Sequence, residues 1–202
     1  MKIALFGSTG RVGSVVFQRV ISEYEVNRLV RRGSGQDAPG TEIIGDVLNE
    51  GDVMKTIEGS EAVVSCLNTD KEDVLTKSMP ILLKAMRSYG VKRIITCGTA
   101  GILQARSEDG LYRFQSSESK RRSTTAAEDH LRAFLMLQAS EMDWTIVCPT
   151  YLPDGERIGN YRTERDVLPE GGSSISKYDT GDFIYKQLSD LSFIKSRVGI
   201  CY

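Results

Sequence analysis

Three glycines near the amino terminus have the spacing of a phosphate-binding turn, since they follow a short apolar run in the order G-x-x-G-x-x-G. The first glycine of such a turn permits a sharp bend, the second lets a pyrophosphate approach the backbone, and the third lets a helix lie close to the sheet. Freed backbone N–H groups and the helix dipole then favour an anion. We predict a dinucleotide site here, against the alternative of a plain strand-to-helix turn. Its residues are Gly7, Ser8, Thr9, Gly10, Arg11, Val12 and Gly13.

Two arginines, Arg31 and Arg32, follow the second apolar run. A site selective for NAD carries an acidic residue at this position to hold the ribose 2′-hydroxyl. Guanidinium groups instead bind phosphates through two parallel hydrogen bonds and stay charged. We therefore expect NADP (NADPH) rather than NAD as the cofactor, with Arg11 as a further ligand of the same phosphate. Solvated surface arginines are the alternative.

Polar residues also follow the third and fourth apolar runs. Asp46, with Val47, comes where the adenine amino group of a dinucleotide is expected, although an aspartate before a helix is just as often a cap. Leu67, Asn68 and Thr69 end the fourth run, where ligands of open α/β sheets bind. We predict that they pass beneath the cofactor's ribose, although polar residues at a strand end are also ordinary turn chemistry.

The elements that must position these residues alternate along the chain. Short apolar, β-branched runs occupy residues 3–6, 26–30, 42–44, 62–67, 93–97, 144–148 and 198–201. Helical periodicity occurs at 12–20, 53–57, 74–86, 131–137 and 179–191, with Asn49 as a cap, Gly59 and Gly90 as helix ends, and Pro80 expected to kink or restart its helix. This alternation predicts an α/β fold with a parallel sheet. The polar segment 104–125 has no clear period and is interpreted as a loop.

The composition excludes several classes of protein. Lys and Arg number 26 against 27 Asp and Glu, so no overall charge attracts a nucleic acid or a membrane surface. The four cysteines lack the close spacing of a zinc or redox motif and are read as small buried residues of a reducing compartment. A single histidine, His130, argues against a histidine-based metal site, and we expect no metal. We expect one domain, 1–202, located in the cytoplasm. An edge strand or a helix face could pair with a second copy, so the sequence leaves open whether the protein forms a homodimer.

These motifs together resemble the atypical short-chain dehydrogenase/reductase superfamily, especially the NAD(P)-binding proteins grouped with flavin/biliverdin-IX-beta reductase and the NmrA-like proteins. The resemblance covers nearly the whole chain and rests on residues 2–13, 29–32, 45–47 and 143–149. It implies a doubly wound, mostly parallel sheet of Rossmann topology, in the order 3-2-1-4-5-6 and in three layers. Residues 104–125 and 150–180 would then supply small elements on the substrate side.

The resemblance also implies residues for the nicotinamide end of the site. In the biliverdin/flavin reductase branch a serine and a histidine lie there, and the matching positions hold Thr99 and Tyr151, with Pro149 beside the cofactor. The Tyr-x-x-x-Lys pair of short-chain dehydrogenases is missing, because Lys120 and Thr124 stand at its two positions. Thr99 can still donate a hydrogen bond, and a phenol can release a proton if its pKa falls. The alternative is that both residues are structural.

Two further groups of residues have weaker interpretations. His130 has no metal-ligand companion that the sequence reveals, and a single histidine is more typical of a structural residue. Residues 120–122 form a basic run, with Arg106 and Arg113 nearby, which either recruits an acidic substrate over the cofactor or is a solvated helix start.

The sequence therefore predicts an NADP(H)-dependent oxidoreductase, a reductase of a small flavin-, quinone- or carbonyl-type substrate, with no nucleic acid or membrane as partner. The alternative is a non-catalytic, NmrA-like NADP-binding redox sensor, which the missing Tyr-x-x-x-Lys pair favours. The retained threonine and tyrosine favour the enzyme.

Overall fold

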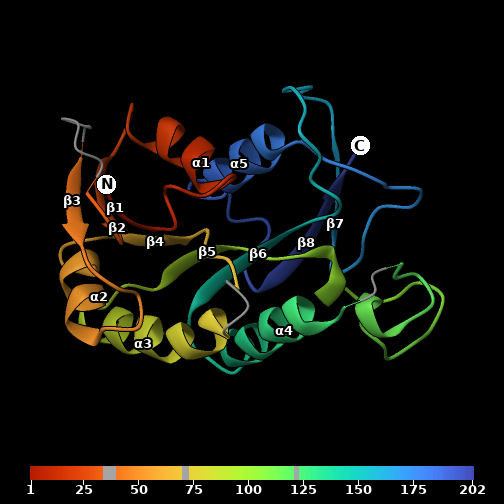
Figure 1. Cartoon of the computed structure of the whole chain (residues 1–202), viewed down its shortest axis with the longest axis horizontal. Coiled ribbons are helices and arrows are strands. Elements are labelled where there is room, and N and C mark those ends of the chain that lie inside the picture. The colour runs from red at the N-terminus through yellow and green to blue at the C-terminus, as the bar shows by residue number, and fades with distance from the viewer. Residues whose placement is uncertain (34–39, 70–72, 121–122) are drawn as a thin grey trace.

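A computed structural model describes residues 1–33, 40–69, 73–120 and 123–202 as one sheet covered by helices (Figure 1). The strands follow the order β3-β2-β1-β4-β5-β6-β8-β7, and all neighbours are parallel except β7 and β8. The predicted order 3-2-1-4-5-6 is thus confirmed. The strands are β1 (Lys2–Phe6), β2 (Glu25–Val30), β3 (Thr41–Ile44), β4 (Ala62–Ser65), β5 (Arg93–Cys97), β6 (Asp143–Pro149), β7 (Arg162–Arg165) and β8 (Ser196–Cys201).

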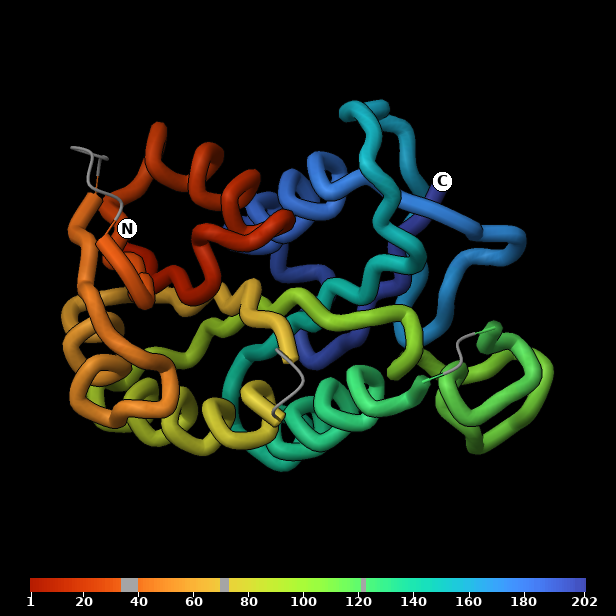
Figure 2. The backbone as a smooth tube through the Cα atoms, viewed as in Figure 1, coloured from red at the N-terminus to blue at the C-terminus, as the bar shows by residue number. Residues whose placement is uncertain are grey.

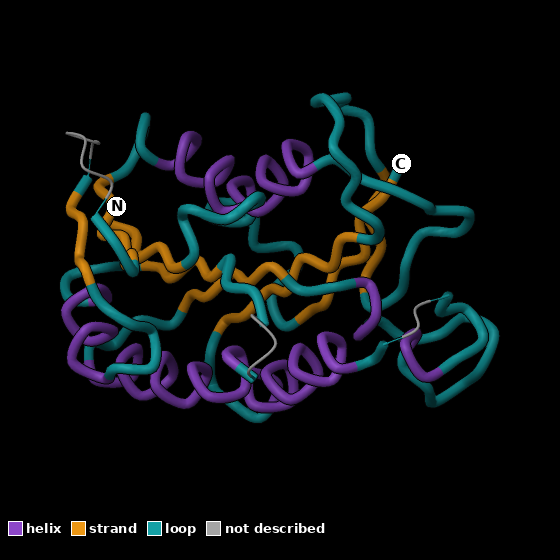
Figure 3. The backbone as a smooth tube through the Cα atoms, in the orientation of Figure 1, coloured by secondary structure: helices purple, strands orange, loops and turns teal. Residues whose placement is uncertain are grey.

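Helices cover both faces of this sheet, which gives the three layers that the doubly wound α/β fold requires (Figure 3). One layer holds α1 (Gly13–Val20) and α5 (Lys177–Lys186), which pack together. The other holds α2 (Glu50–Ile57), α3 (Val74–Ser88) and α4 (Thr125–Gln138). Side chains of β1 alternate between two hydrophobic cores, with Ala4 and Phe6 in one and Ile3 and Leu5 in the other. A strand buried on both faces explains why its sequence is continuously apolar.

Strand β1 lies at the point where the chain reverses its direction of travel across the sheet. After β1 the chain moves outward to β2 and β3, and then returns to add β4 on the other side of β1. Loops that leave the carboxyl ends of β1 and β4 therefore diverge, and such a crevice is where open α/β sheets bind ligands. The turn after β1 passes under α1 at this place (Figure 2).

Several local expectations hold, and others need correction. Gly59 and Gly90 take positive φ angles after α2 and α3, and Asn49 accepts a hydrogen bond from Asp52 N–H as the cap of α2. Helix α3 runs through Pro80 without restarting. The last helix ends at Lys186, not near residue 191, because turns lead from there into β8.

Strand β7 is an element that the apolar pattern misses, because its four residues are Arg-Thr-Glu-Arg. It pairs antiparallel with β8 at the edge of the sheet. Within the predicted loop 104–125, the described part 104–120 is more ordered than a plain loop, since it contains the 3-10 helix η2 (Arg113–Gln115) and a bridge between Gln104 and Tyr112. No helix in the described ranges is long and apolar enough to cross a bilayer.

Candidate functional site

The turn between β1 and α1 needs glycine at its first and third glycine positions. Gly7 has a φ angle of +78°, and a Cβ atom there would lie 2.5 Å from the carbonyl oxygen of Cys66. A Cβ atom on Gly13 would overlap the carbonyl oxygen of Gly7. Both predicted roles, the sharp turn and the close approach of the helix, are therefore what these two glycines do.

Gly10 differs, because it is exposed and a Cβ atom there would be less crowded than at Gly7 or Gly13. A Cβ atom there would meet the Gly7 carbonyl oxygen at 3.3 Å and the Cys66 carbonyl oxygen at 3.9 Å. Among the described residues, the backbone N–H groups of Thr9, Arg11 and Val12 have no backbone acceptor. Unpaired N–H groups at the start of a helix favour a bound anion. The turn thus leaves these three N–H groups available to an anion.

Ser8 adds a buried hydroxyl to this turn. Its side chain is 3% exposed, and its Oγ atom has no hydrogen-bond partner in the part of the chain that the structure describes. A buried polar atom without a partner is costly, and a ligand can supply the missing bond. The residues present therefore fit a diphosphate: a backbone cradle, free N–H groups and one unsatisfied hydroxyl.

Arg31 and Arg32 lie at the carboxyl end of β2, and both are exposed. The next strand along the sheet is β3, and Gly45 N–H donates to the carbonyl oxygen of Val30 at 2.9 Å, so Asp46 lies close to the two arginines. The fold thus brings together the residues predicted for the phosphorylated ribose and for the adenine.

Asp46 and its neighbours also have local roles. The Asp46 carboxylate accepts a hydrogen bond from Leu48 N–H at 2.9 Å, and Val47 is buried in the core. Asn49, not Asp46, caps α2. Asp46 therefore closes a turn and keeps its carboxylate at the surface.

The residues after β4 lie against the glycine turn, since Cys66 and Leu67 are the neighbours of Gly7. Asn68 is exposed and its side-chain oxygen accepts from Thr69 N–H at 2.8 Å, whereas Leu67 packs against the core. Cys66 and Cys97 end neighbouring strands and are half-buried. Burial raises the pKa of Cys97 to about 12 and also raises that of Cys66, so both remain protonated thiols near neutral pH.

Thr99 follows β5 and is 7% exposed. Its Oγ1 accepts a hydrogen bond from Gly101 N–H at 3.3 Å and so caps the 3-10 helix η1 (Ala100–Ile102). Within the described residues the Thr99 hydroxyl hydrogen has no acceptor, which leaves it free to donate to a ligand.

Tyr151 follows β6, whose last residue is the buried Pro149. Its side chain is 66% exposed, while its backbone oxygen accepts from Ile175 N–H at 2.9 Å. The phenol therefore faces solvent, while the backbone of Tyr151 is held in place. Like Thr99, Tyr151 lies at the carboxyl ends of the strands.

Arg11 lies elsewhere than the sequence suggests. It is expected to share a phosphate with the arginines after β2, but its Nη2 atom donates to the carbonyl oxygen of Leu152 and to Asp154, each at 3.0 Å. These partners belong to the loop after β6, on the opposite side of the turn from β2. Arg11 thus links the glycine turn to the segment after β6.

Asp179 fixes that segment, a contact that the sequence does not reveal. It is nearly fully buried, and its carboxylate accepts hydrogen bonds from the N–H groups of Ile158 and Gly159, both at 3.0 Å, and from Tyr202 Oη at 2.6 Å. Burial acts to raise the pKa of Asp179, but these hydrogen bonds outweigh it, so the pKa is lowered. Asp179 therefore joins the segment after β6 to the first turn of α5, whose cap is Ser176.

Replacing Asp179 by asparagine is expected to remove a pH-dependent part of the stability. A carboxylate whose folded pKa lies below the unfolded value of about 3.9 stabilises the fold above that pH. This contribution is lost as the pH falls through the folded pKa. In urea titrations D179N should cost about 2 kcal/mol at pH 7 and distinctly less at pH 3.

The matched control is D154N, which changes an exposed carboxylate of the same segment. We expect it to alter the free energy of unfolding by less than about 0.5 kcal/mol at either pH. An equal loss for D179N at both values of pH would contradict the assignment.

The sequence pattern of a family described as NAD(P)H-binding matches residues 7–191 of this chain. The match begins at the first glycine of the turn and reaches past α5. It therefore includes every residue predicted for the site.

Solved structures of similar fold cover the chain from end to end. A proposed exported protein from Burkholderia pseudomallei is 25% identical, with a TM-score of 0.87 and coverage of 100% of both chains. A proposed NADH-flavin reductase from Streptococcus pneumoniae is 22% identical, with a TM-score of 0.84 and coverage of 100% of this chain and 99% of that one. A proposed epimerase from Bacteroides thetaiotaomicron is 25% identical, with a TM-score of 0.83 and coverage of 100% and 96%.

Proposed function

The chain belongs to the NAD(P)H-binding family, and from this premise we propose that it is an NADP(H)-dependent reductase of a small flavin-, quinone- or carbonyl-type substrate. The observation that carries the proposal is the glycine turn after β1, with its unpaired N–H groups and the unsatisfied Ser8 hydroxyl. The S. pneumoniae protein of the same fold, proposed to be an NADH-flavin reductase, supports the choice of reaction.

On this proposal the turn and its neighbours hold the cofactor. Backbone N–H groups of Thr9, Arg11 and Val12, with the Ser8 hydroxyl, would bind the diphosphate. Arg31 and Arg32 would bind the 2′-phosphate that distinguishes NADP from NAD, because no acidic residue stands between β2 and Gly33. When bound, the reduced nicotinamide supplies a hydride.

Thr99 and Tyr151 have the proton chemistry that a reduction needs. The Thr99 hydroxyl is fixed by its bond from Gly101 N–H and keeps its hydrogen for a substrate carbonyl or a carboxamide. Tyr151 carries an exposed phenol at the same edge of the sheet and is the candidate proton donor to the reduced substrate. On this proposal a small-molecule substrate contacts both groups. The function needs neither a nucleic acid nor a membrane as partner.

A second candidate function is that of an NmrA-like redox sensor, which binds NADP without turnover. It is favoured by the side chains at the two positions of the missing Tyr-x-x-x-Lys pair. Lys120 is exposed, and the Thr124 hydroxyl donates to Glu128 at 2.6 Å, so neither is arranged to replace that pair. In that case Thr99 only caps η1.

Incubating the protein with NADPH and a panel of flavins, quinones and aldehydes tests the reductase. We expect absorbance of the reduced nicotinamide to fall with at least one of them, and Y151F to lower kcat at least about 10-fold. Y89F is the matched control, because Tyr89 is an exposed tyrosine that follows α3 and so lies at the amino ends of the strands. Tight NADPH binding without turnover on the whole panel would instead support the sensor.

A further inference from the structure

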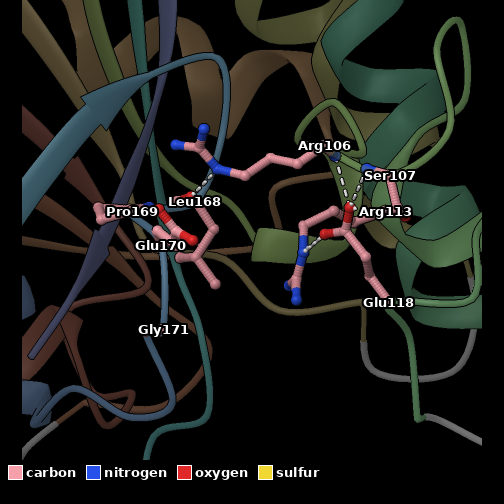
Figure 4. Close-up of a pocket in the computed structure, with 9 residues that line it drawn as sticks. Arg106, Ser107, Arg113, Glu118, Leu168, Pro169, Glu170 and Gly171 are labelled. Carbon is pink, nitrogen blue, oxygen red and sulfur yellow. Dashed lines mark hydrogen bonds and ion pairs between the residues drawn. The ribbon is translucent and has the colours of Figure 1, made fainter.

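A cavity of about 360 Å³ lies between the two segments expected on the substrate side. One wall comes from the segment after η1 and the other from the turn after β7, at the end of the molecule where β8 and β7 lie (Figures 2 and 4). This volume is within the range of small-molecule sites. Its lining residues are Arg106, Ser107, Arg113, Glu118 and the run from Leu168 to Gly172.

Arg113 is the polar group of this cavity with unused binding capacity. Its Nε atom donates to Glu118 at 2.8 Å, while its two terminal nitrogens have no hydrogen-bond partner among the residues described. The guanidinium end points away from Glu118 into the space between the segments (Figure 4). Its side chain is only 20% exposed, so a ligand there meets a largely desolvated fork of two N–H donors.

Glu118 holds Arg113 in this orientation. Its Oε1 atom accepts from the N–H groups of Arg106 and Ser107 and from the Ser107 hydroxyl, so the carboxylate itself is fixed. Burial acts to raise its pKa, but the hydrogen bonds from Arg113, Ser107 and Arg106 outweigh it and lower the pKa to about 2. Glu118 is therefore charged at all physiological pH, and the fork is preorganised before any ligand arrives.

The opposite wall is close-packed, and it is apolar apart from Glu170. Leu168 and Pro169 are buried, and Leu168 is further fixed because its carbonyl oxygen accepts from Arg106 Nε at 2.9 Å. A Cβ atom on Gly172 would overlap the sulfur of Cys201, so this wall cannot carry a larger residue at that position. A ligand with one charged end and a compact apolar body matches the two walls.

The charges decide which anion fits. The four charged lining residues, Arg106, Arg113, Glu118 and Glu170, sum to no net charge, and Arg106 is also paired with Glu164 beside the cavity. A phosphate dianion would be poorly compensated there, whereas a monocarboxylate needs only the free fork of Arg113. We propose that this cavity binds the carboxylate of a small monocarboxylate ligand through Arg113, with its apolar body against Leu168 and Pro169.

The position of the cavity connects it to the proposed reaction. Phe114, the neighbour of Arg113, lies 3.5 Å from the position of a Cβ atom on Gly101, and the Thr99 methyl lies 3.6 Å from the same point. The residue that follows Arg113 thus packs beside the segment that carries Thr99. The inference that this carboxylate belongs to the substrate rests on the proposed reductase function. The binding of a carboxylate at Arg113 does not rest on it.

Titrating benzoate against the protein by calorimetry or ligand-observed NMR tests the site, with benzamide as the uncharged probe. We expect saturable binding of benzoate, no comparable binding of benzamide, and at least about tenfold weaker binding to R113Q. R87Q is the matched control, since Arg87 forms a similar pair with Glu141 on a distant surface and should bind benzoate like the wild type. Unchanged affinity in R113Q, or equal binding of benzamide, would overturn the proposal.

A second variant covers the case in which R113Q does not fold. R113K keeps a positive charge for Glu118 but lacks the fork, and is expected to bind benzoate more weakly than the wild type. Wild-type affinity in R113K would count against the site. NADPH titrations of the same samples separate the two proposals: cofactor binding without benzoate binding sinks only the carboxylate site, and benzoate binding without any NADPH uptake sinks only the reductase.

Discussion

Replacing Gly10 by valine is expected to abolish dinucleotide binding while leaving the protein folded. The new side chain would start from an exposed position of the turn, where a Cβ atom meets two carbonyl oxygens, at 3.3 and 3.9 Å. A diphosphate needs the space at this position to reach the N–H groups of Thr9, Arg11 and Val12. We expect at least about 100-fold weaker NADPH binding, or about 2.7 kcal/mol, with a melting temperature within a few degrees of the wild type.

The matched variant is Gly13→Ala, which adds less volume to the same turn but in a closed place. Its Cβ atom would overlap the Gly7 carbonyl oxygen, so the helix must move away from the sheet. Overpacking of this kind costs about 1–3 kcal/mol, and we expect the melting temperature to fall by about 3–10 °C. If G10V bound NADPH like the wild type, or if it unfolded as readily as G13A, the exposed position of the turn would not be the ligand site.

The contrast between Gly10 and Gly13 shows how far the sequence leads. Spacing alone assigns a role to each glycine, and the roles of Gly7 and Gly13 are confirmed because they follow from local backbone geometry. The same holds for strands such as β1, β4 and β6, whose apolar runs are dictated by burial on both faces. Local signals therefore predict the sheet and the glycine turn.

What the sequence does not predict depends on partners far along the chain. The amino terminus of α3 is satisfied by Asp129 of α4, whose carboxylate accepts from the N–H groups of Leu75 and Thr76. Arg11 pairs with Asp154, and Asp179 accepts hydrogen bonds from the backbone of Ile158 and Gly159, because the fold brings distant loops together. No spacing rule encodes such pairs. Strand β7 was not predicted for a similar reason, because its four polar residues form a strand only through their pairing with β8.

Replacing Arg31 and Arg32 by alanine is expected to weaken binding of NADP about 100-fold and to change binding of NAD by less than about threefold. Both side chains lie at the carboxyl end of β2, next to Asp46 and in the position where the ribose of a dinucleotide is held in this fold. A hydrogen bond to a charged group contributes about 1.5–3 kcal/mol, so the loss of the phosphate contacts matches this factor. NAD lacks this phosphate, so the double substitution removes no phosphate contact from it.

Parallel calorimetric titrations with NADP and NAD distinguish this from a general electrostatic effect. R87A is the control, because it removes a positive charge at a surface pair with Glu141, away from the carboxyl ends of the strands, and should leave both affinities unchanged. Glycine turns bind the diphosphate common to both cofactors, so only a contact to the 2′-phosphate can separate the two ligands. Equal losses for NADP and NAD in the double variant would therefore remove the arginines from the specificity site, while leaving the diphosphate cradle of Gly7, Gly10 and Gly13 untouched.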